Sequence, residues 1–167
     1  NQGHSILWSS ILIQGCPYTC SFCEQGTELW AKLQRRPIQH LIDEIDFLTE
    51  YSPVQIRYFD SNIGIVKEYE QLYEYVVDRK NTLGWDVTLT GVDYAKNNID
   101  RIMYLQKLAA ENGLTELTGM IALQDTDLEV LQLNGRPGEK DFLKIDAYAK
   151  MLKEITGRPS PRVDIIL

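Results

Sequence analysis

The sequence predicts an α/β protein in which parallel strands alternate with helices. Three observations predict it. The chain has 167 residues, about the length of one domain. Short β-branched runs recur along it, and amphipathic segments with helical spacing separate these runs. Each strand–helix–strand unit needs a right-handed crossover, so the strands should lie parallel. We therefore expect one domain over residues 1–167, with its functional residues where the strands end.

Five segments are predicted to be strands because they are short, apolar and rich in β-branched residues. The first is rich in isoleucine and leads directly into a cluster of cysteines. Polar residues follow the others, including Asp60, Asp93 and Gln124. The predicted strands occupy residues 6–13, 54–59, 86–92, 117–123 and 163–167.

Apolar residues at helical spacing predict the intervening helices. Pro37 is expected to open the first, because proline suits the first helical turn. Pairs such as Asn112-Gly113 are good helix ends. The predicted helices occupy residues 37–52, 69–80, 99–111, 126–133 and 142–156.

Composition excludes several classes of protein. Hydrophobic residues make up 44% of the chain, which is too many for an intrinsically disordered protein. No apolar run approaches the ~20 residues of a membrane span. Lys and Arg number 17 against 24 Asp and Glu, a net charge of −7. Nucleic-acid binding depends on basic residues, and Arg35-Arg36 is the densest basic pair, so nucleic acid is not the expected partner.

The chain begins at Asn1 and ends within a predicted strand, so we expect it to be a piece of a longer protein. No signal segment precedes a cleavage site. All three cysteines lie within eight residues, a pattern that cannot build a disulfide framework. Clustered free thiols favour a reducing compartment, and we expect the cytoplasm.

The cysteine loop carries the chemistry. Cys16, Cys20 and Cys23 are spaced C-x3-C-x2-C. Zinc normally takes four ligands in separated pairs, but the chain has no fourth cysteine and its histidines, His4 and His40, lie outside the loop. Three thiolates on one loop suit three irons of a 4Fe-4S cluster. The fourth iron would then be open to a substrate or cofactor.

This loop resembles the signature of the radical S-adenosylmethionine (SAM) superfamily. The pattern is C-x3-C-x-aromatic-C, with Phe22 as the aromatic residue, directly after a first β-strand. The resemblance implies a 4Fe-4S cluster whose unique iron binds the amino and carboxylate groups of SAM. Electron transfer then cleaves SAM to methionine and a 5′-deoxyadenosyl radical. It also implies a partial TIM-type (β/α)6 barrel, of which at least five strands are present here.

The resemblance extends to SAM-binding segments. Residues Asp60, Ser61 and Asn62 occupy the place of the motif that binds SAM's amino group, although the usual Gly-Gly-Glu is absent. Gln124 and Arg136 resemble the residues that meet the ribose and the carboxylate. Arginine is chemically suited to a carboxylate. Phe22 completes the set of cofactor-binding residues that we expect.

Within the superfamily, Gly-Cys-Pro-Tyr-Thr-Cys-Ser-Phe-Cys and Phe-Asp-Ser-Asn-Ile-Gly look most like the cobalamin-binding class. That class often carries cobalamin on a separate domain, which would lie outside this chain. The expected partners are a small-molecule or peptide substrate and a reductant such as flavodoxin or ferredoxin. Two alternatives stay open: an RNA-modifying methylthio- or methyltransferase, and an iron–sulfur electron-transfer module.

Plainer interpretations compete for each residue. The cysteines can be an incomplete zinc knuckle or unrelated thiols in an α/β binding domain. The segment 60–62 can be a turn that caps the helix near Val66. Residues 124–125 can simply open the next helix. Arg136 can be a solvated loop residue, and Asp93 a structural one.

Overall fold

The central feature of the computed structural model is a parallel three-stranded sheet in the order β1-β4-β5. A second parallel pair, β6-β7, lies further along the chain. All five overlap the predicted strands, which confirms a parallel α/β fold. Their bounds are β1 Ile6–Ser10, β4 Val54–Tyr58, β5 Val87–Thr90, β6 Ile121–Gln124 and β7 Val163–Ile165. The structure describes residues 5–90, 98–114, 121–125, 127–135, 149–150, 153–154 and 163–165.

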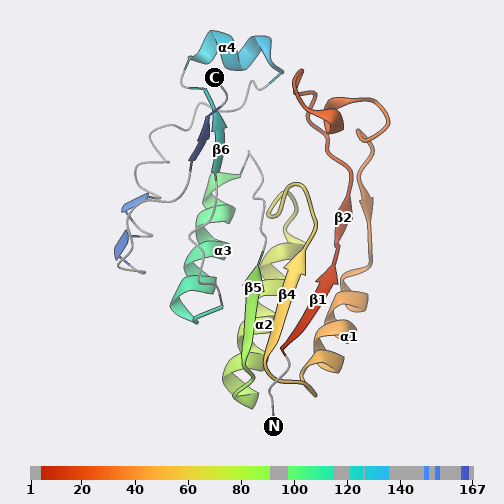
Figure 1. Cartoon of the computed structure of the whole chain (residues 1–167), viewed down its shortest axis with the longest axis vertical. Helices are drawn as coiled ribbons and strands as arrows, with labels where there is room; N and C mark the ends of the chain where they lie inside the picture. The colour runs from red at the N-terminus through yellow and green to blue at the C-terminus, as the bar shows by residue number, and fades with distance from the viewer. Residues whose placement is uncertain are drawn as a thin grey trace.

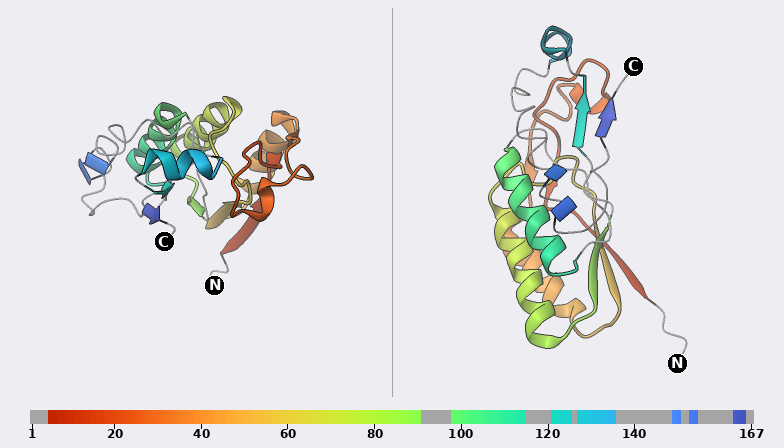
Figure 2. Two further views of the ribbon diagram at one scale, coloured as in Figure 1. Left: turned by 90° about the horizontal axis from the view of Figure 1, so that it is seen from above. Right: turned by 90° about the vertical axis from the view of Figure 1, so that its left-hand side faces the viewer.

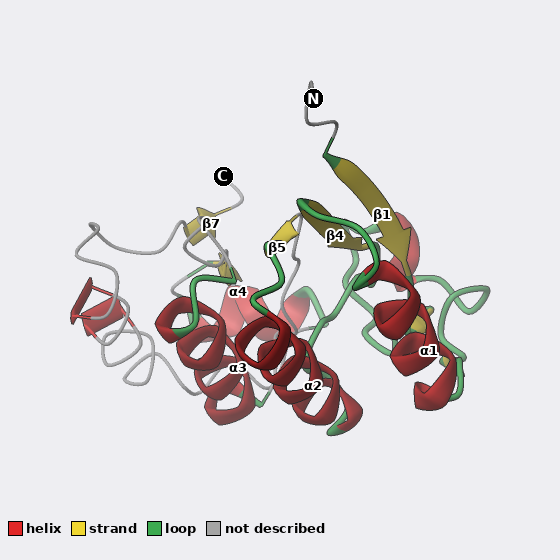
Figure 3. Cartoon of the chain, turned by 90° about the horizontal axis from the view of Figure 1, so that it is seen from below, coloured by secondary structure: helices red, strands yellow, loops and turns green. Residues whose placement is uncertain are grey.

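Three long helices cover one face of the β1-β4-β5 sheet and lie side by side there (Figures 2 and 3). A short fourth helix, α4, lies beyond the carboxyl ends of the strands (Figure 1). The helices are α1 Ile38–Leu48, α2 Glu68–Leu83, α3 Ile99–Glu111 and α4 Leu128–Leu133. Most of the predicted helix 142–156 lies outside the described residues. Within the described part, no helix has the length and apolar character that crossing a membrane requires.

The core lies between the sheet and the three helices. Along β4 the side chains alternate between buried and exposed, as a strand with one covered face requires. Val54 and Ile56 point into the core, where they meet fully buried residues of α2 such as Leu72 and Val76. This packing fixes the carboxyl ends of β1 and β4 relative to each other.

The opposite face of the sheet has a different character. Its residues are exposed on β1 and β4 and half-buried on β5. They form two rows across the register: Leu7, Gln55 and Thr88, then Ser9, Arg57 and Thr90. Five of the six are polar.

The first strand is shorter than predicted. The continuous strand over residues 6–13 is wrong, because β1 ends at Ser10 and a separate strand, β2 Ile13–Gln14, follows. The backbone N–H groups of Leu12 and Ile13 donate to the carboxylate of Asp60 instead of extending the parallel ladder. The chain then turns, and β2 pairs antiparallel with β3 Gln34–Arg35.

Candidate functional site

The cysteine loop leaves the carboxyl end of β1 and is closed at its base. The β2–β3 ladder pairs Ile13 with Arg35 and Gln14 with Gln34. Above it, the Cys16 N–H donates to the Trp30 carbonyl at 2.8 Å. The sequence indicated an irregular loop here, since two-residue strands leave no detectable pattern. The ladder holds the two ends of the loop side by side and so fixes where the loop begins.

Gly15 is required where the two sides of the loop meet. Its φ of 101° lies in the region that side chains disfavour. A Cβ atom there would come within 2.7 Å of the Lys32 carbonyl oxygen. Glycine therefore allows the segment that bears Cys16 to lie directly against the returning chain.

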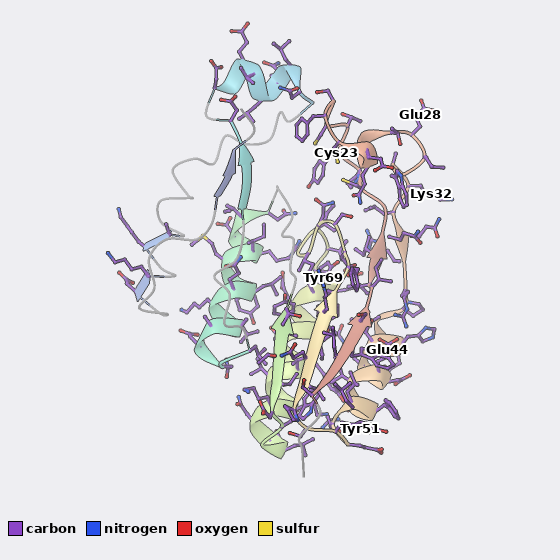
Figure 4. The ribbon with its side chains drawn as sticks, in the orientation of Figure 1. Cys23, Glu28, Lys32, Glu44, Tyr51 and Tyr69 are labelled. Atoms are coloured by element: carbon purple, nitrogen blue, oxygen red, sulfur yellow. The ribbon has the colours of Figure 1, made fainter. Side chains whose placement is uncertain are left out.

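The three thiols sit at one end of the sheet. Cys16 and Cys20 are buried and Cys23 is half-buried. Cys20 and Cys23 are joined by a tight turn in which the Cys23 N–H donates to the Cys20 carbonyl at 3.1 Å. Figure 4 labels Cys23 at the upper end of the loop, on the side that faces α4.

The short α4 helix ends against this loop. The Ser21 hydroxyl donates to Asn134 Oδ1 at 2.6 Å, and the Ser21 N–H donates to the Asn134 carbonyl at 3.4 Å. A Cβ on Gly135 would lie 2.6 Å from the Thr19 carbonyl oxygen. The segment after β6 therefore reaches the cysteine loop, as parallel strand ends are expected to do. Arg136 follows immediately and lies outside the described residues.

Asn62 lies next to the first cysteine. Its Nδ2 donates to Cys16 Sγ at 3.2 Å. The residue is only 4% exposed, and its Oδ1 is buried without a hydrogen-bond partner among the residues that the structure describes. The sequence identified Asn62 as a candidate for cofactor binding, and the structure places it within hydrogen-bond distance of a predicted cluster ligand. Its contact with SAM stays a prediction.

Asp60 is turned toward the protein interior. It is 2% exposed, and its carboxylate accepts hydrogen bonds from the N–H groups of Leu12 and Ile13 and from the Tyr69 hydroxyl at 2.8 Å. Burial raises the pKa of the Asp60 carboxyl, and these hydrogen bonds oppose that shift without cancelling it. The same burial, together with the Asp60 charge, raises the pKa of the Tyr69 hydroxyl.

These contacts give Asp60 a structural role that the sequence did not indicate. It anchors the chain four residues before Cys16 to the end of β4. The alternative that segment 60–62 caps a helix is wrong, because Lys67 is the N-cap residue of α2 and no side chain caps this helix. Tyr69 was likewise missed. No local pattern connects Tyr69 to Leu12. Both donate to the Asp60 carboxylate, and Asp60 lies 48 residues after Leu12 in the sequence.

For the other residues predicted to bind a cofactor, the structure gives only their position in the fold. Ser61 is half-buried on the same turn as Asn62, and Phe22 is exposed on the loop. Gln124 is the last residue of β6, and its side chain is outside the described part, as is Asp93. Asp125 Oδ1 accepts from the Asp127 N–H, and Asp127 caps α4, so Asp125 does lie at the opening of this helix.

The donor set fits a 4Fe-4S cluster. Three thiols share one closed loop, and a buried amide faces Cys16, as expected beside a thiolate sulfur. Among the described residues, no three His, Cys, Asp or Glu side chains converge on a single point that could hold one ion. Cluster thiolates bind three different irons, so a cluster does not require such convergence.

Two curated proteins are similar to the chain in sequence. The cobalamin-dependent radical SAM methyltransferase TokK of Streptomyces tokunonensis is 28% identical over 138 residues, which cover 83% of this chain and 19% of TokK. The 2-(S-pantetheinyl)-carbapenam-3-carboxylate methyltransferase of Streptantibioticus cattleyicolor is 29% identical over 119 residues, 71% of this chain and 17% of that protein. The chain thus spans less than a fifth of either relative. No protein-family model matches it.

The fold has counterparts among solved structures. The radical SAM methyltransferase TsrM of Kitasatospora setae, with cobalamin and a [4Fe-4S] cluster bound, aligns with a TM-score of 0.68 at 15% identity. That alignment covers 95% of this chain and 30% of TsrM. A second TsrM structure, with tryptophan substrate and the SAM analogue aza-SAM, gives 0.65 at the same identity over 95% and 29% of the two chains.

These likenesses agree with the site. The likeness to TokK, a cobalamin-dependent radical SAM methyltransferase, confirms the resemblance to the cobalamin-binding radical SAM class that the cysteine loop predicted. The likeness to TsrM shows that the fold is shared.

Proposed function

We propose that this chain is the catalytic core of a cobalamin-dependent radical SAM methyltransferase. The observation that carries the proposal is the closed loop of Cys16, Cys20 and Cys23, with the end of α4 docked against it. The two sequence relatives, both methyltransferases, support it. They lend no support to the RNA-modifying or electron-transfer alternatives.

In this proposal the three thiolates hold a 4Fe-4S cluster, which supplies an electron to SAM when both are bound. The protein's own contribution is to hold the ligands and the SAM-binding groups in place. Asp60 fixes the start of the loop, and Asn134 fixes its tip against α4. Arg136, two residues beyond Asn134, is proposed to bind the SAM carboxylate, and Gln124 the ribose.

The substrate is proposed to approach the sheet face that the helices leave uncovered. That face carries Ser9, Gln55 and Arg57, and the Arg57 guanidinium lies 4.9 Å from the centre of the Phe59 ring. Polar groups with one exposed aromatic suit a polar small molecule. TsrM, with the same fold, is described with tryptophan as its substrate. A cobalamin domain outside this chain, a protein reductant such as flavodoxin or ferredoxin, and the reducing cytoplasm complete the proposal.

The test uses the full-length protein, reconstituted anaerobically with iron and sulfide and supplied with cobalamin, SAM and a reductant. The proposal predicts near-stoichiometric iron and sulfide, and formation of S-adenosylhomocysteine together with 5′-deoxyadenosine. A stable cluster with neither product would favour an electron-transfer module instead. Absence of iron from a folded protein would favour an α/β binding domain.

A further inference from the structure

We infer that Asn62 tunes the reduction potential of the cluster through a hydrogen bond to the Cys16 sulfur, an inference that rests on the proposed function. Nδ2 lies 3.2 Å from Cys16 Sγ, and both residues are buried. Hydrogen bonds to the cluster's sulfurs are among the factors that set its potential. They withdraw negative charge from the sulfur and so favour the reduced state.

The chemistry of the pair fixes which way the amide points. A cysteine that binds iron is a thiolate, which carries no proton and can only accept a hydrogen bond. The amide nitrogen, rather than the oxygen, must therefore face Cys16. In this orientation Oδ1 of Asn62 is buried and has no hydrogen-bond partner within the described part of the chain. An amide kept buried with one end unsatisfied is costly, so the other end is expected to contribute to the function of the site.

The turn that carries Asn62 is held from several sides, so the amide cannot easily swing away. The Ile65 N–H donates to the Asn62 carbonyl at 3.1 Å, and Ile63 is completely buried. Arg101 of α3 donates to the Gly64 carbonyl at 3.1 Å. Two residues before Asn62, the carboxylate of Asp60 holds the backbone that leads to Cys16. The donor and the acceptor are thus positioned by the same anchor.

The sequence alone could not assign this role. Asp60-Ser61-Asn62 is ordinary turn chemistry, and the partner lies 46 residues earlier in the chain. The amide is a positioning residue that acts on the cluster through Cys16. The predicted effect is therefore electronic, and a change in potential distinguishes it from simple support of the fold.

The experiment is a redox titration of the full-length reconstituted protein, followed by electron paramagnetic resonance without SAM. Asn62→Leu keeps the size of the side chain and removes the N–H. At a fixed solution potential we expect the ratio of reduced to oxidised cluster to fall about tenfold, a shift of about 59 mV for a one-electron couple. Ile63→Val is the matched control, because it loosens the same turn without removing a donor, and it should leave the potential unchanged.

An unchanged potential in Asn62→Leu, with full iron content, would overturn the inference, as would an equal shift in Ile63→Val. If Asn62→Leu fails to hold a cluster, the wild-type protein still decides. With asparagine labelled by a heavy nitrogen isotope in its side-chain amide, electron–nuclear double resonance should detect a nitrogen coupled to the reduced cluster. Asn134 also contacts the loop, but its amide nitrogen donates to the Val130 carbonyl of α4, so we do not expect it to produce the coupling. No coupling would overturn the inference. Failure of the proposed function is distinguishable, because it appears as a missing cluster or absent SAM products.

Discussion

The Tyr69 hydroxyl of α2 donates a 2.8 Å hydrogen bond to the Asp60 carboxylate at the end of β4. The same carboxylate accepts from the N–H groups of Leu12 and Ile13. One buried anchor therefore joins a helix, a strand and the chain entering the cysteine loop. Figure 4 labels Tyr69 beside the end of β4. We therefore expect the position of the predicted cluster ligands to depend on this anchor.

Tyr69→Phe removes one hydrogen bond to a buried charged group, which is worth about 1.5–3 kcal/mol. We expect the free energy of unfolding to fall by that amount, measured by urea denaturation of the full-length protein. Tyr75→Phe, on the same helix, is the control. Its hydroxyl donates to the exposed Asp46, so its loss should cost less than about 1 kcal/mol. If both variants lose the same free energy of unfolding, the hydrogen bond from Tyr69 to Asp60 contributes no more than an exposed one.

Gly135→Ala should disturb the contact between α4 and the cysteine loop. The new Cβ would lie 2.6 Å from the Thr19 carbonyl oxygen, so the two segments must separate. We expect SAM to bind at least about tenfold more weakly, because a small displacement removes well-aligned hydrogen bonds. Gly113→Ala shares the positive φ but has open space around it, and SAM affinity should not change. A similar effect of both substitutions would mean that backbone strain alone is responsible.

Arg136→Ala should weaken SAM binding about ten- to a hundredfold, since an arginine–carboxylate hydrogen bond is worth about 1.5–3 kcal/mol. Iron and sulfide content should stay at the wild-type level, because Arg136 is no ligand of the cluster. Equilibrium binding of SAM to the reconstituted protein measures the effect. If the affinity is unchanged, the carboxylate is bound by another residue, with Lys140 the next candidate.

Glu44 predicts a pH dependence. Burial alone would raise its pKa, but hydrogen bonds from Ser10, Arg36 and Trp8 outweigh burial and lower the pKa below its ordinary value of 4.5. Figure 4 shows Glu44 on α1 beside β1. Because the folded-state pKa is lowered, the ionised carboxylate stabilises the fold at neutral pH. This contribution is lost as the pH falls below about 4.5 through the folded-state pKa.

Glu44→Gln should therefore lower the free energy of unfolding by about 1 kcal/mol at pH 7, since the ion pair between Glu44 and Arg36 is only partly buried. The difference from wild type should shrink in acid. Urea denaturation at pH 7 and in acid measures this difference in the free energy of unfolding. The cluster-free full-length protein is used, so that loss of the cluster in acid does not contribute. Glu50→Gln, exposed on the turn after α1, is the control and should show no such change. If the difference between Glu44→Gln and wild type grows in acid, the pKa of Glu44 is not lowered in the folded protein.

The sequence predicted the features that are encoded locally. Residues 54–58 form a strand because buried and exposed side chains alternate along them, and α3 ends at Glu111 because Asn112-Gly113 follows. The cysteine loop was identified from its spacing, from the aromatic Phe22 and from its position after the first strand. Convergence of its tip with the segment after β6 was expected from parallel topology, and the contact between Ser21 and Asn134 agrees with it.

Features that depend on distant partners were not predicted. The strand over residues 6–13 was extended too far, because its apolar pattern continues through Leu12 while its N–H groups turn to Asp60. The anchoring role of Asp60 was not predicted, since a polar residue at a strand end looks the same in sequence whether it faces a ligand or the interior; its contact with SAM stays a prediction. The β2–β3 ladder is too short to leave a pattern.

The central claim is that Cys16, Cys20 and Cys23 hold a cluster whose fourth iron is open to SAM. The most direct measurement is electron paramagnetic resonance of the reduced, reconstituted full-length protein before and after SAM is added. Wild type should give a 4Fe-4S signal that SAM shifts, and replacing any of the three cysteines by Ala should abolish the signal. An unshifted signal in a protein that binds SAM, or a triple Ala variant that keeps near-stoichiometric iron and sulfide, would contradict the account.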